Sequence, residues 1–433
     1  MTDRNQPVDK IPADTGASAG LLRVGTVFER PESQRPQGGS PEDVHAWLLG
    51  PARRLEDTVE LVDELSWRLV AAGVPLTRVT ISLPTLHPQF LNNGYRWSRA
   101  SGRCEEMLVG HGIRDSAVFL NSPMHRVFIH GETVRRRLTG ETARLDFPIL
   151  DDLAREGMTD YIALPVELSD GRRMAITLAT DREGGFSRND FTVLESIVGL
   201  LAPLLEIRVM RSIARNLLSA YLGAQAGQRV LAGDIERGRG ETTRAVIWFC
   251  DLRGFTALAE RLKEENVVAF LDAYFERVVR ALHARDGEVL KFLGDGLIAI
   301  FPVPDIEFAA NATRRACEAA CAAIADVDAL AGHAALDGEP VPRVCVSLHV
   351  GNVFYGNIGA ADRLDFTVIG PAVNLVARVD QLSKTLDRRL LMTADFAKVC
   401  NQKLESLGKH PIRGVAEPIE VFGLMPGAED VVR

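Results

Sequence analysis

A long helical pattern followed by a glycine-rich stretch divides this chain into two parts. Apolar residues keep helical spacing from Ser187, a candidate N-terminal cap, to about residue 222. Several glycines and mixed charges follow, so residues 210–240 are predicted to form a helical and glycine-rich connector. Because strand and helix patterns alternate on both sides of the connector, we predict two domains of the α/β (α+β) class.

The part before the connector is predicted to hold a tail and one domain. Residues 1–40 are rich in Pro, Gly, Ser, Asp and Arg and have few apolar anchors, which predicts a disordered tail. Residues 41–209 begin with helical spacing and continue with the strand patterns "RVTISL", "DYIALPVEL" and "RMAITLAT". The last two patterns are joined by "SDG", a hairpin turn signal.

The composition is that of a globular protein. The chain has 433 residues, 46% of them hydrophobic, and a formal net charge of -8, which argues against a nucleic-acid-binding protein. Its six cysteines form no CxxC pair, which fits a reducing compartment. The N-terminus lacks an apolar signal core, and the apolar patch "IVGLLAPLL" is too short to span a bilayer. We therefore expect a cytoplasmic protein without a membrane span.

Two acidic turns mark the part of the chain after residue 240. The strand-like run "AVIWF" leads to Asp251, and Gly254, Phe255 and Thr256 open a helix whose backbone N–H groups would attract phosphate oxygens. The second turn, "LGDG", places Asp295 between two strand patterns. Two such carboxylates could converge on two metal ions. The spacing alone is equally compatible with ordinary turn residues.

Two further pairs of polar residues stand out near these turns. Lys291 lies four residues before Asp295, so the two either pair with each other or face different ligands. Asn374 and Arg378 lie at i and i+4 of a helix that Pro371 begins, so both project from one face. An amide and a guanidinium on one face suit an anionic transition state. A solvated polar stripe would satisfy the same spacing.

Three motifs in this order, "FCDLRGFT", "KFLGDG" and "DFTVIGPAVNLVAR", strongly resemble the class III nucleotidyl cyclase catalytic domain. The resemblance covers roughly residues 241–425, and we predict the catalytic domain over 241–433. It implies a ferredoxin-like fold that dimerises head to tail, with active sites in the cleft between two catalytic domains. A homodimer and a bound ATP molecule are the expected partners.

The resemblance implies a metal site and a base-reading pair. Asp251 and Asp295 match the aspartates that bind two Mg2+ or Mn2+ ions per site, and Leu252 matches the position that lends a backbone carbonyl. Lys291 and Asp365 match the pair that reads the purine. Adenylate cyclases commonly have Lys with Asp or Thr there, whereas guanylate cyclases tend to have Glu and Cys. A carboxylate accepts from the amino group of adenine, and a lysine donates to a ring nitrogen.

The remaining site residues are implied in the same way. Asn374 matches the residue that orients the ribose, and Arg378 matches the one that stabilises charge at the α-phosphate. Arg413 falls where the family carries a basic triphosphate contact, and Arg343 matches a further pyrophosphate contact. Each site would combine the two aspartates of one chain with the base-reading and transition-state residues of its partner.

The closing part of the N-terminal domain, from "YIALPVEL" to "GFSRNDFTVLESIVGLLAPLLE", resembles GAF domains, although the PAS pattern is close. This resemblance implies a sensor domain of unknown ligand, linked to the catalytic domain by the connector. The leading hypothesis is an adenylate cyclase that converts ATP to 3′,5′-cyclic AMP and pyrophosphate. A guanylate cyclase and a catalytically silent nucleotide-binding regulator on the same fold are the alternatives.

Overall fold

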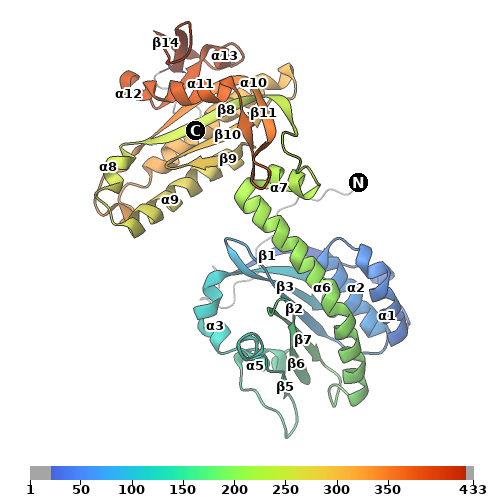
Figure 1. The fold of residues 1–433 in the computed structure, drawn as a ribbon. Helices are drawn as coiled ribbons and strands as arrows, with labels where there is room; N and C mark the ends of the chain where they lie inside the picture. The colour runs from blue at the N-terminus through green and yellow to red at the C-terminus, as the bar shows by residue number, and fades with distance from the viewer. Residues whose placement is uncertain (1–20, 426–433) are drawn as a thin grey trace. The chain divides into compact units, whose positions relative to one another are not determined.

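The computed structural model describes residues 21–425 and divides into two compact units between Leu217 and Leu218 (Figure 1). The division falls inside helix α6 (Arg188–Leu222), so one continuous helix contributes residues to both units. Ser187 caps this helix as expected, because its hydroxyl accepts a hydrogen bond of 3.2 Å from the backbone N–H of Asp190. No helix in the described part of the chain is long and apolar enough to cross a membrane.

The first unit contains, within residues 21–217, an antiparallel seven-stranded sheet of order β1-β4-β3-β2-β7-β6-β5. Its strands are β1 (Leu22–Glu29), β2 (Arg78–Pro84), β3 (Phe90–Ser98), β4 (Arg103–Gly110), β5 (Val134–Arg137), β6 (Asp160–Glu167) and β7 (Arg173–Thr180). The strand predictions for "RVTISL", "DYIALPVEL" and "RMAITLAT" are therefore confirmed as β2, β6 and β7. In β2 the buried residues Val79, Ile81 and Leu83 alternate with less buried ones, as a strand with one face on a core requires.

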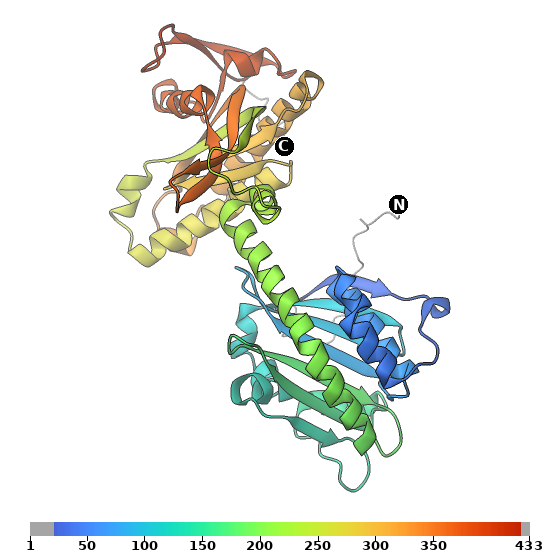
Figure 2. The same cartoon turned by 45° about the vertical axis from the view of Figure 1, so that its right-hand side comes forward.

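Helices cover both faces of this sheet. The helices of this unit before α6 are α1 (Pro41–Leu49), α2 (Thr58–Ala71), α3 (Ala117–Leu120), α4 (Pro123–His125) and α5 (Pro148–Arg155). Residues of α1, α2 and α6 share one apolar core with the sheet, and residues of α5 share a second core with its other face. Figure 2 shows α6, drawn in green, running along the sheet of this unit.

The predicted disordered tail over residues 1–40 is wrong where the structure describes it. Strand β1 pairs with β4, with Leu22 opposite Val109 and Glu29 opposite Arg103, and residues 1–20 lie outside the described residues. Just after β1, Arg30 forms ion pairs of 2.5 Å with Asp63 and 2.7 Å with Glu64 of α2. Composition missed this edge strand because it is only partly buried and is anchored by backbone pairing and charge.

The second unit is built on an eight-stranded sheet within residues 218–425. Seven of these strands follow the order β14-β15-β13-β11-β8-β10-β9, and β12 pairs with β11 outside this order. The strands are β8 (Gly240–Arg253), β9 (Glu288–Leu293), β10 (Gly296–Pro302), β11 (Arg343–Gly359), β12 (Leu364–Ile369), β13 (Leu390–Thr393), β14 (Leu404–His410) and β15 (Ile419–Leu424). The pair of β11 with β13 is parallel, and the other pairs are antiparallel.

The central elements have the predicted ferredoxin-like topology. In chain order they are β8, α9 (Glu264–His283), β9, β10, α10 (Ile306–Asp328) and β11, which is a β-α-β-β-α-β unit. The other helices of the unit are α7 (Ala224–Leu231), α8 (Phe255–Ala259), α11 (Pro371–Asp380), α12 (Leu382–Leu386) and α13 (Ala394–Ala397). The strands predicted on either side of the turn that holds Asp295, and the helix that Pro371 begins, are confirmed as β9, β10 and α11.

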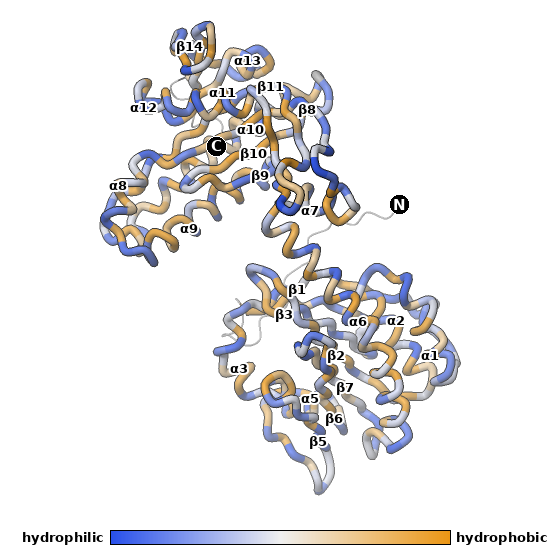
Figure 3. Tube along the Cα trace, viewed as in Figure 1, coloured by the Kyte–Doolittle hydropathy of each residue, from blue (hydrophilic) through white to orange (hydrophobic). Residues whose placement is uncertain are grey.

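Different helices pack against the two faces of this sheet. Even-numbered residues of β8, such as Trp248 and Cys250, lie in the large core with α9 and α10. Odd-numbered residues, Ala245 and Ile247, lie in a second core that also holds residues of α7, β12 and α11. The apolar strands stand out in orange in Figure 3. This alternation decides which side chains of β8 point toward α11.

Helix α7 corrects the prediction of a connector over residues 210–240. Ala226 is fully buried in the second core, and a Cβ on Gly223 would lie 3.2 Å from the carbonyl oxygen of Val289 in β9. The guanidinium of Arg229 lies 5.2 Å from the ring centroid of Phe366 in β12. Helix α7 is therefore packed against the sheet of the second unit, because small residues allow this close approach.

Strand β11 runs through Gly351, a residue type that often marks a break in a strand pattern. It is continuous, with Gly351 opposite Ala245 of β8. A Cβ on Gly351 would lie 2.7 Å from the Cβ of Ala372 in α11 and 2.8 Å from Nε2 of His349. The absence of a side chain at Gly351 thus lets α11 approach the sheet. In a sequence pattern the same glycine resembles a turn signal.

Glu288 is a carboxylate buried on the second face, with 7% of its surface exposed. The hydroxyl of Tyr355 donates a hydrogen bond of 2.8 Å to its Oε1, and its Oε2 has no partner within residues 21–425. Burial raises the pKa of Glu288 above its ordinary value, against the opposing effects of Tyr355 and Arg229. A carboxyl group with a raised pKa binds protons more tightly in the folded state than in the unfolded chain.

We therefore predict that Glu288 makes the second unit less stable as pH rises from its unfolded pKa toward its folded pKa. Glu288→Gln should remove this contribution, so the decrease in melting temperature between about pH 5 and pH 8 should be smaller in the variant. Differential scanning calorimetry of the full chain measures this loss. Glu265→Gln, at an exposed position of α9, is the matched control and should keep the original slope. An unchanged slope in Glu288→Gln would contradict the prediction.

Candidate active site

Asp251 lies near the end of β8, on the face that α11 covers. It continues the row of Ala245 and Ile247, and its Cα partner in β11 is Cys345. Its odd position along the strand therefore directs the carboxylate away from the large core of α9 and α10. The backbone places an acidic group beside the helix that carries Asn374 and Arg378.

Asp295 occupies the turn between β9 and β10 and lies beside Asp251. Gly296 follows it, and a Cβ there would lie 2.5 Å from the carbonyl oxygen of Cys250 and 3.4 Å from Oδ1 of Asp251. Burial and the neighbouring Asp251 carboxylate together raise the pKa of Asp295. The predicted convergence of the two carboxylates is thus present in one chain, and their like charges oppose each other.

The donor set of this carboxylate pair fits a hard divalent cation. Carboxylate oxygens are preferred ligands of Mg2+ and Mn2+, and Mg2+ commonly takes only one or two carboxylates together with substrate phosphates. A cation would also offset the repulsion between the two groups. The described residues contain no cluster of three or more His, Cys, Asp or Glu side chains suited to a metal. The pair therefore fits an ion that shares its ligands with a substrate.

Leu252 and Phe255 can serve this site only through their backbones, whereas the side chain of Thr256 is exposed. The side chain of Leu252 is buried in the large core, and that of Phe255 packs against the same core. Helix α8 has five residues, and Gly254 precedes it with a φ of 81°. Such a short helix has a weak dipole, so the predicted attraction for phosphate depends on individual N–H groups.

Lys291 forms an ion pair with Asp365. Lys291 lies opposite Ile298 in the pairing of β9 with β10, and Asp365 lies opposite Ile358 in the pairing of β12 with β11. The side chains are 47% and 45% exposed, so a ligand can reach both. The structure thus answers the question that the sequence left open, because Lys291 pairs with Asp365 and not with Asp295.

Arg378 and Arg413 are brought together from distant parts of the chain. The guanidinium of Arg378 donates a hydrogen bond of 2.7 Å to the carbonyl oxygen of Arg413. Gly414 makes room for it, since a Cβ there would lie 2.9 Å from Nη1 of Arg378. Asn374, one turn earlier on α11, is exposed. Two predicted anion contacts therefore lie next to each other.

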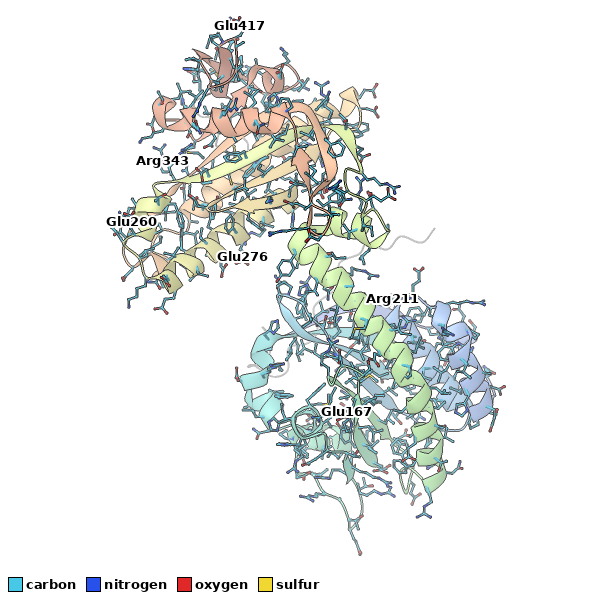
Figure 4. All side chains as sticks on the ribbon, viewed as in Figure 1. Glu167, Arg211, Glu260, Glu276, Arg343 and Glu417 are labelled. Atoms are coloured by element: carbon cyan, nitrogen blue, oxygen red, sulfur yellow. The ribbon has the colours of Figure 1, made fainter. Side chains whose placement is uncertain are left out.

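Arg343 lies at the other end of the site, where β11 begins. It is opposite Arg253 in the pairing of β8 with β11, and it forms an ion pair of 2.8 Å with Asp387. Figure 4 shows Arg343 at the end of the sheet near α8. This position is close to the end of β8 that carries Asp251.

The sequence prediction missed a buried ion pair between Arg253 and Asp380. One Nη of Arg253 donates to a carboxylate oxygen of Asp380 and also, at 2.5 Å, to its backbone carbonyl. Ser347 of β11 donates a bond of 3.4 Å to the second carboxylate oxygen. Burial raises the pKa of Asp380 to about 7, although Arg253 opposes this shift. A signal was available, because Asp380 lies four residues after the buried Val376 on the apolar stripe of α11.

The site residues form separate groups within one chain. The carboxylates of Asp251 and Asp295 lie together, and Lys291 lies with Asp365. No hydrogen bond or ion pair joins these two groups in the portion of the chain that the structure describes. Within the described residues the two groups are therefore joined by no direct polar contact.

Comparison with known proteins agrees with this geometry. Residues 239–425 match the family described as the adenylate and guanylate cyclase catalytic domain. The match supports the resemblance that the three motifs predicted for this part of the chain. The resemblance of the first unit to GAF domains stays a prediction.

Curated relatives and solved structures are similar over this same part. An adenylate cyclase of Anabaena cylindrica is 31% identical over 165 residues, which are 38% of this chain and 32% of the relative. Adenylate cyclase 1 of Rhizobium meliloti (strain 1021) is 28% identical over 178 residues, 40% of this chain and 26% of the relative. The chain thus spans about a third or less of the length of these relatives. The structure of the adenylyl cyclase CyaB from P. aeruginosa is 22% identical, with a TM-score of 0.40, over 43% of this chain and 96% of that chain.

Close packing at Gly296 leads to a prediction about the carboxylate pair. Gly296→Ala would press a methyl group against the backbone of Cys250, so we expect a loss of stability of about 1–3 kcal/mol as the two strands separate. Chemical denaturation of the full chain measures this loss. Gly199→Ala in α6 is the matched control, because open space surrounds that position and alanine favours a helix. Equal stability of the two variants would contradict the prediction.

Proposed function

We propose that this chain is an adenylate cyclase, in which the catalytic domain over residues 239–425 converts ATP to 3′,5′-cyclic AMP and pyrophosphate. The observation that carries the proposal is the accessible pair of Lys291 and Asp365, whose chemistry suits adenine. Two of the relatives that are similar over this domain are adenylate cyclases, which supports the same substrate class.

The base-reading pair discriminates by hydrogen-bond polarity. The carboxylate of Asp365 accepts from the amino group of adenine, and the ammonium of Lys291 donates to a ring nitrogen. Guanine would present a carbonyl oxygen to Asp365, and a mismatched polar contact disfavours binding strongly. In the free protein the two side chains pair with each other, but an exposed ion pair stabilises by only about 1 kcal/mol or less. ATP can therefore replace it at small cost.

The reaction joins the 3′-oxygen of the ribose to the α-phosphorus and breaks the bond from that phosphorus to the pyrophosphate. Asp251 and Asp295 would hold divalent cations, Mg2+ or Mn2+, which when bound would lower the pKa of the 3′-hydroxyl and offset the charge of the triphosphate. Asn374 orients the ribose, and Arg378 donates to the oxygens of the α-phosphate as charge develops there. The hydroxyl proton is released to solvent.

Further phosphate contacts come from residues around these groups. Arg413 lies beside Arg378 and binds the triphosphate, and Arg343 binds the pyrophosphate end. The backbone N–H groups of Phe255 and Thr256 would donate hydrogen bonds to phosphate oxygens, and the backbone carbonyl of Leu252 would coordinate a cation. Holding the reacting atoms in line supplies most of the acceleration.

A homodimer completes each site. We assign the carboxylate pair of one chain and the base-reading pair of its partner to the same site, since no hydrogen bond or ion pair joins these groups within residues 21–425. Apolar side chains beside Lys291 support this arrangement, because Phe292 is 51% and Leu293 42% exposed. A partner chain would cover them. The two-fold arrangement then yields two equivalent sites.

Regulation by the first unit is part of the proposal. Helix α7 joins α6 to the catalytic sheet and contacts β9 and β12, the strands that carry Lys291 and Asp365. A shift of α7 would therefore change the base-reading pair or the dimer geometry. The first unit is the proposed sensor, and its ligand has not been identified.

The proposed base contacts lead to a prediction of nucleotide preference. The unsubstituted protein should turn over ATP with a kcat/KM about 100-fold above that for GTP. The double variant Lys291→Glu/Asp365→Cys should shift this ratio toward GTP, because glutamate accepts from the donors of guanine. Steady-state assays with both nucleotides measure the ratio. Comparable turnover of ATP and GTP by the unsubstituted protein would favour the alternative of a broad or guanylate-specific cyclase.

The shared sites lead to a second prediction, on mixtures of variants. Asp295→Ala and Asn374→Ala should each lower cyclic AMP formation about 1000-fold. Mixed in equal amounts and allowed to exchange subunits, they should regain about a quarter of the original activity, because half of the dimers are heterodimers with one intact site. Mixing Asp295→Ala with Asp251→Ala is the control and should recover nothing. Recovery in the control, or none in the first mixture, would refute shared sites.

A further inference from the structure

The ion pair of Arg253 with Asp380 joins the strand that carries Asp251 to the helix that carries Asn374 and Arg378. We propose that Arg253 and Asp380 are positioning residues, which hold α11 in the orientation needed for turnover. The inference rests on the proposed cyclase activity and concerns residues for which the sequence motifs predicted no role.

The contacts place the ion pair between three elements. Arg253 belongs to β8 and donates to both the carboxylate and the backbone carbonyl of Asp380, at the end of α11. Ser347 of β11 donates to the other carboxylate oxygen. The end of α11 is therefore held by directional bonds to two adjacent strands of the sheet.

Burial restricts the geometry of these hydrogen bonds. Asp380 is 2% exposed, so water cannot replace Arg253 as its partner. The Nε of Arg253 has no hydrogen-bond partner among residues 21–425, so the guanidinium interacts with Asp380 through one Nη. A buried carboxylate with one cationic partner has few alternative geometries of comparable energy.

Apolar packing alone would leave α11 less well defined. Ala372, Val376 and Val379 bury the stripe of the helix that faces the sheet, but apolar contacts have little directional preference. The ion pair adds a fixed point at the C-terminal end of the helix. Arg378 lies two residues before Asp380, and Arg253 lies two residues after Asp251. The ion pair is therefore adjacent in sequence to both Asp251 and Arg378.

In the proposed dimer, Asp251 and Arg378 of one chain serve different sites. The ion pair would then set the distance between the two half-sites that a single subunit contributes. A displacement of about 1 Å at reacting groups can lower turnover about 100-fold. We therefore expect loss of the pair to reduce kcat far more than it changes the KM for ATP.

The test separates positioning from fold stability in the full-length protein. Asp380→Asn removes the charge and should lower both the melting temperature and kcat, because it leaves Arg253 without its counter-ion. Arg253→Met/Asp380→Leu replaces both charges with apolar groups and should restore the melting temperature. Its kcat should stay about 100-fold reduced, while the KM for ATP changes by less than about 3-fold.

Two additional measurements keep the outcome clear if the double variant folds poorly. Arg253→Lys keeps the charge but cannot reach both oxygens in the same way, so kcat should fall about 10-fold with a near-normal melting temperature. Binding of 3′-deoxy-ATP, which lacks the attacking hydroxyl, should be unchanged in calorimetry. Arg280→Ala/Asp326→Ala removes an exposed ion pair of 3.1 Å between α9 and α10 and is the matched control with normal kcat.

The results that overturn the inference differ from those that overturn the proposed function. If the double variant or Arg253→Lys regains full kcat together with its melting temperature, the ion pair only stabilises the fold. If the variants lose 3′-deoxy-ATP binding in proportion to kcat, the pair acts on substrate binding and the positioning role is wrong. If the unsubstituted protein forms no cyclic nucleotide from ATP or GTP, the proposed function itself fails.

Discussion

The antiparallel pairing of β8 with β10 and β11 is the constraint on which the catalytic unit depends. It places Asp251 opposite Cys345 and brings the turn that holds Asp295 against the end of β8. Because side chains alternate along a strand, a shift of one residue would turn Asp251 into the core of α9 and α10. The large apolar core on that face therefore determines the register, and the register determines the acidic site.

The two faces of the sheet divide structural and chemical roles. The face toward α9 and α10 is closed by an almost purely apolar core. The face toward α7 and α11 buries two carboxylates, Glu288 and Asp380, next to the strands and the helix that carry the site. Buried charges destabilise a fold unless they are paired. The presence of both carboxylates on the face of α7 and α11 is therefore consistent with a need to fix the positions of side chains on that face.

The connector between the units illustrates how composition can mislead. Residues 223–240 are rich in glycine, which is typical of a flexible linker. In the structure the small residues of α7 allow it to pack closely against β9, and Arg229 lies over the rings of Phe366 and Tyr355. The same small residues thus permit docking, which places α7 against the strands that carry Lys291 and Asp365.

The sequence by itself determined most strands and helices around the candidate site, because apolar periodicity and turn residues act over a few neighbouring positions. It also located Asp251 and Asp295 at the ends of strands, whereas it missed the edge strand β1, whose anchors are polar. Only the tertiary structure decided which side chains meet. Lys291 pairs with Asp365, 74 residues away, and Arg253 pairs with Asp380, 127 residues away. Sheet register and helix docking bring these residues together. The local sequence pattern predicts neither pair, because it reflects only neighbouring positions.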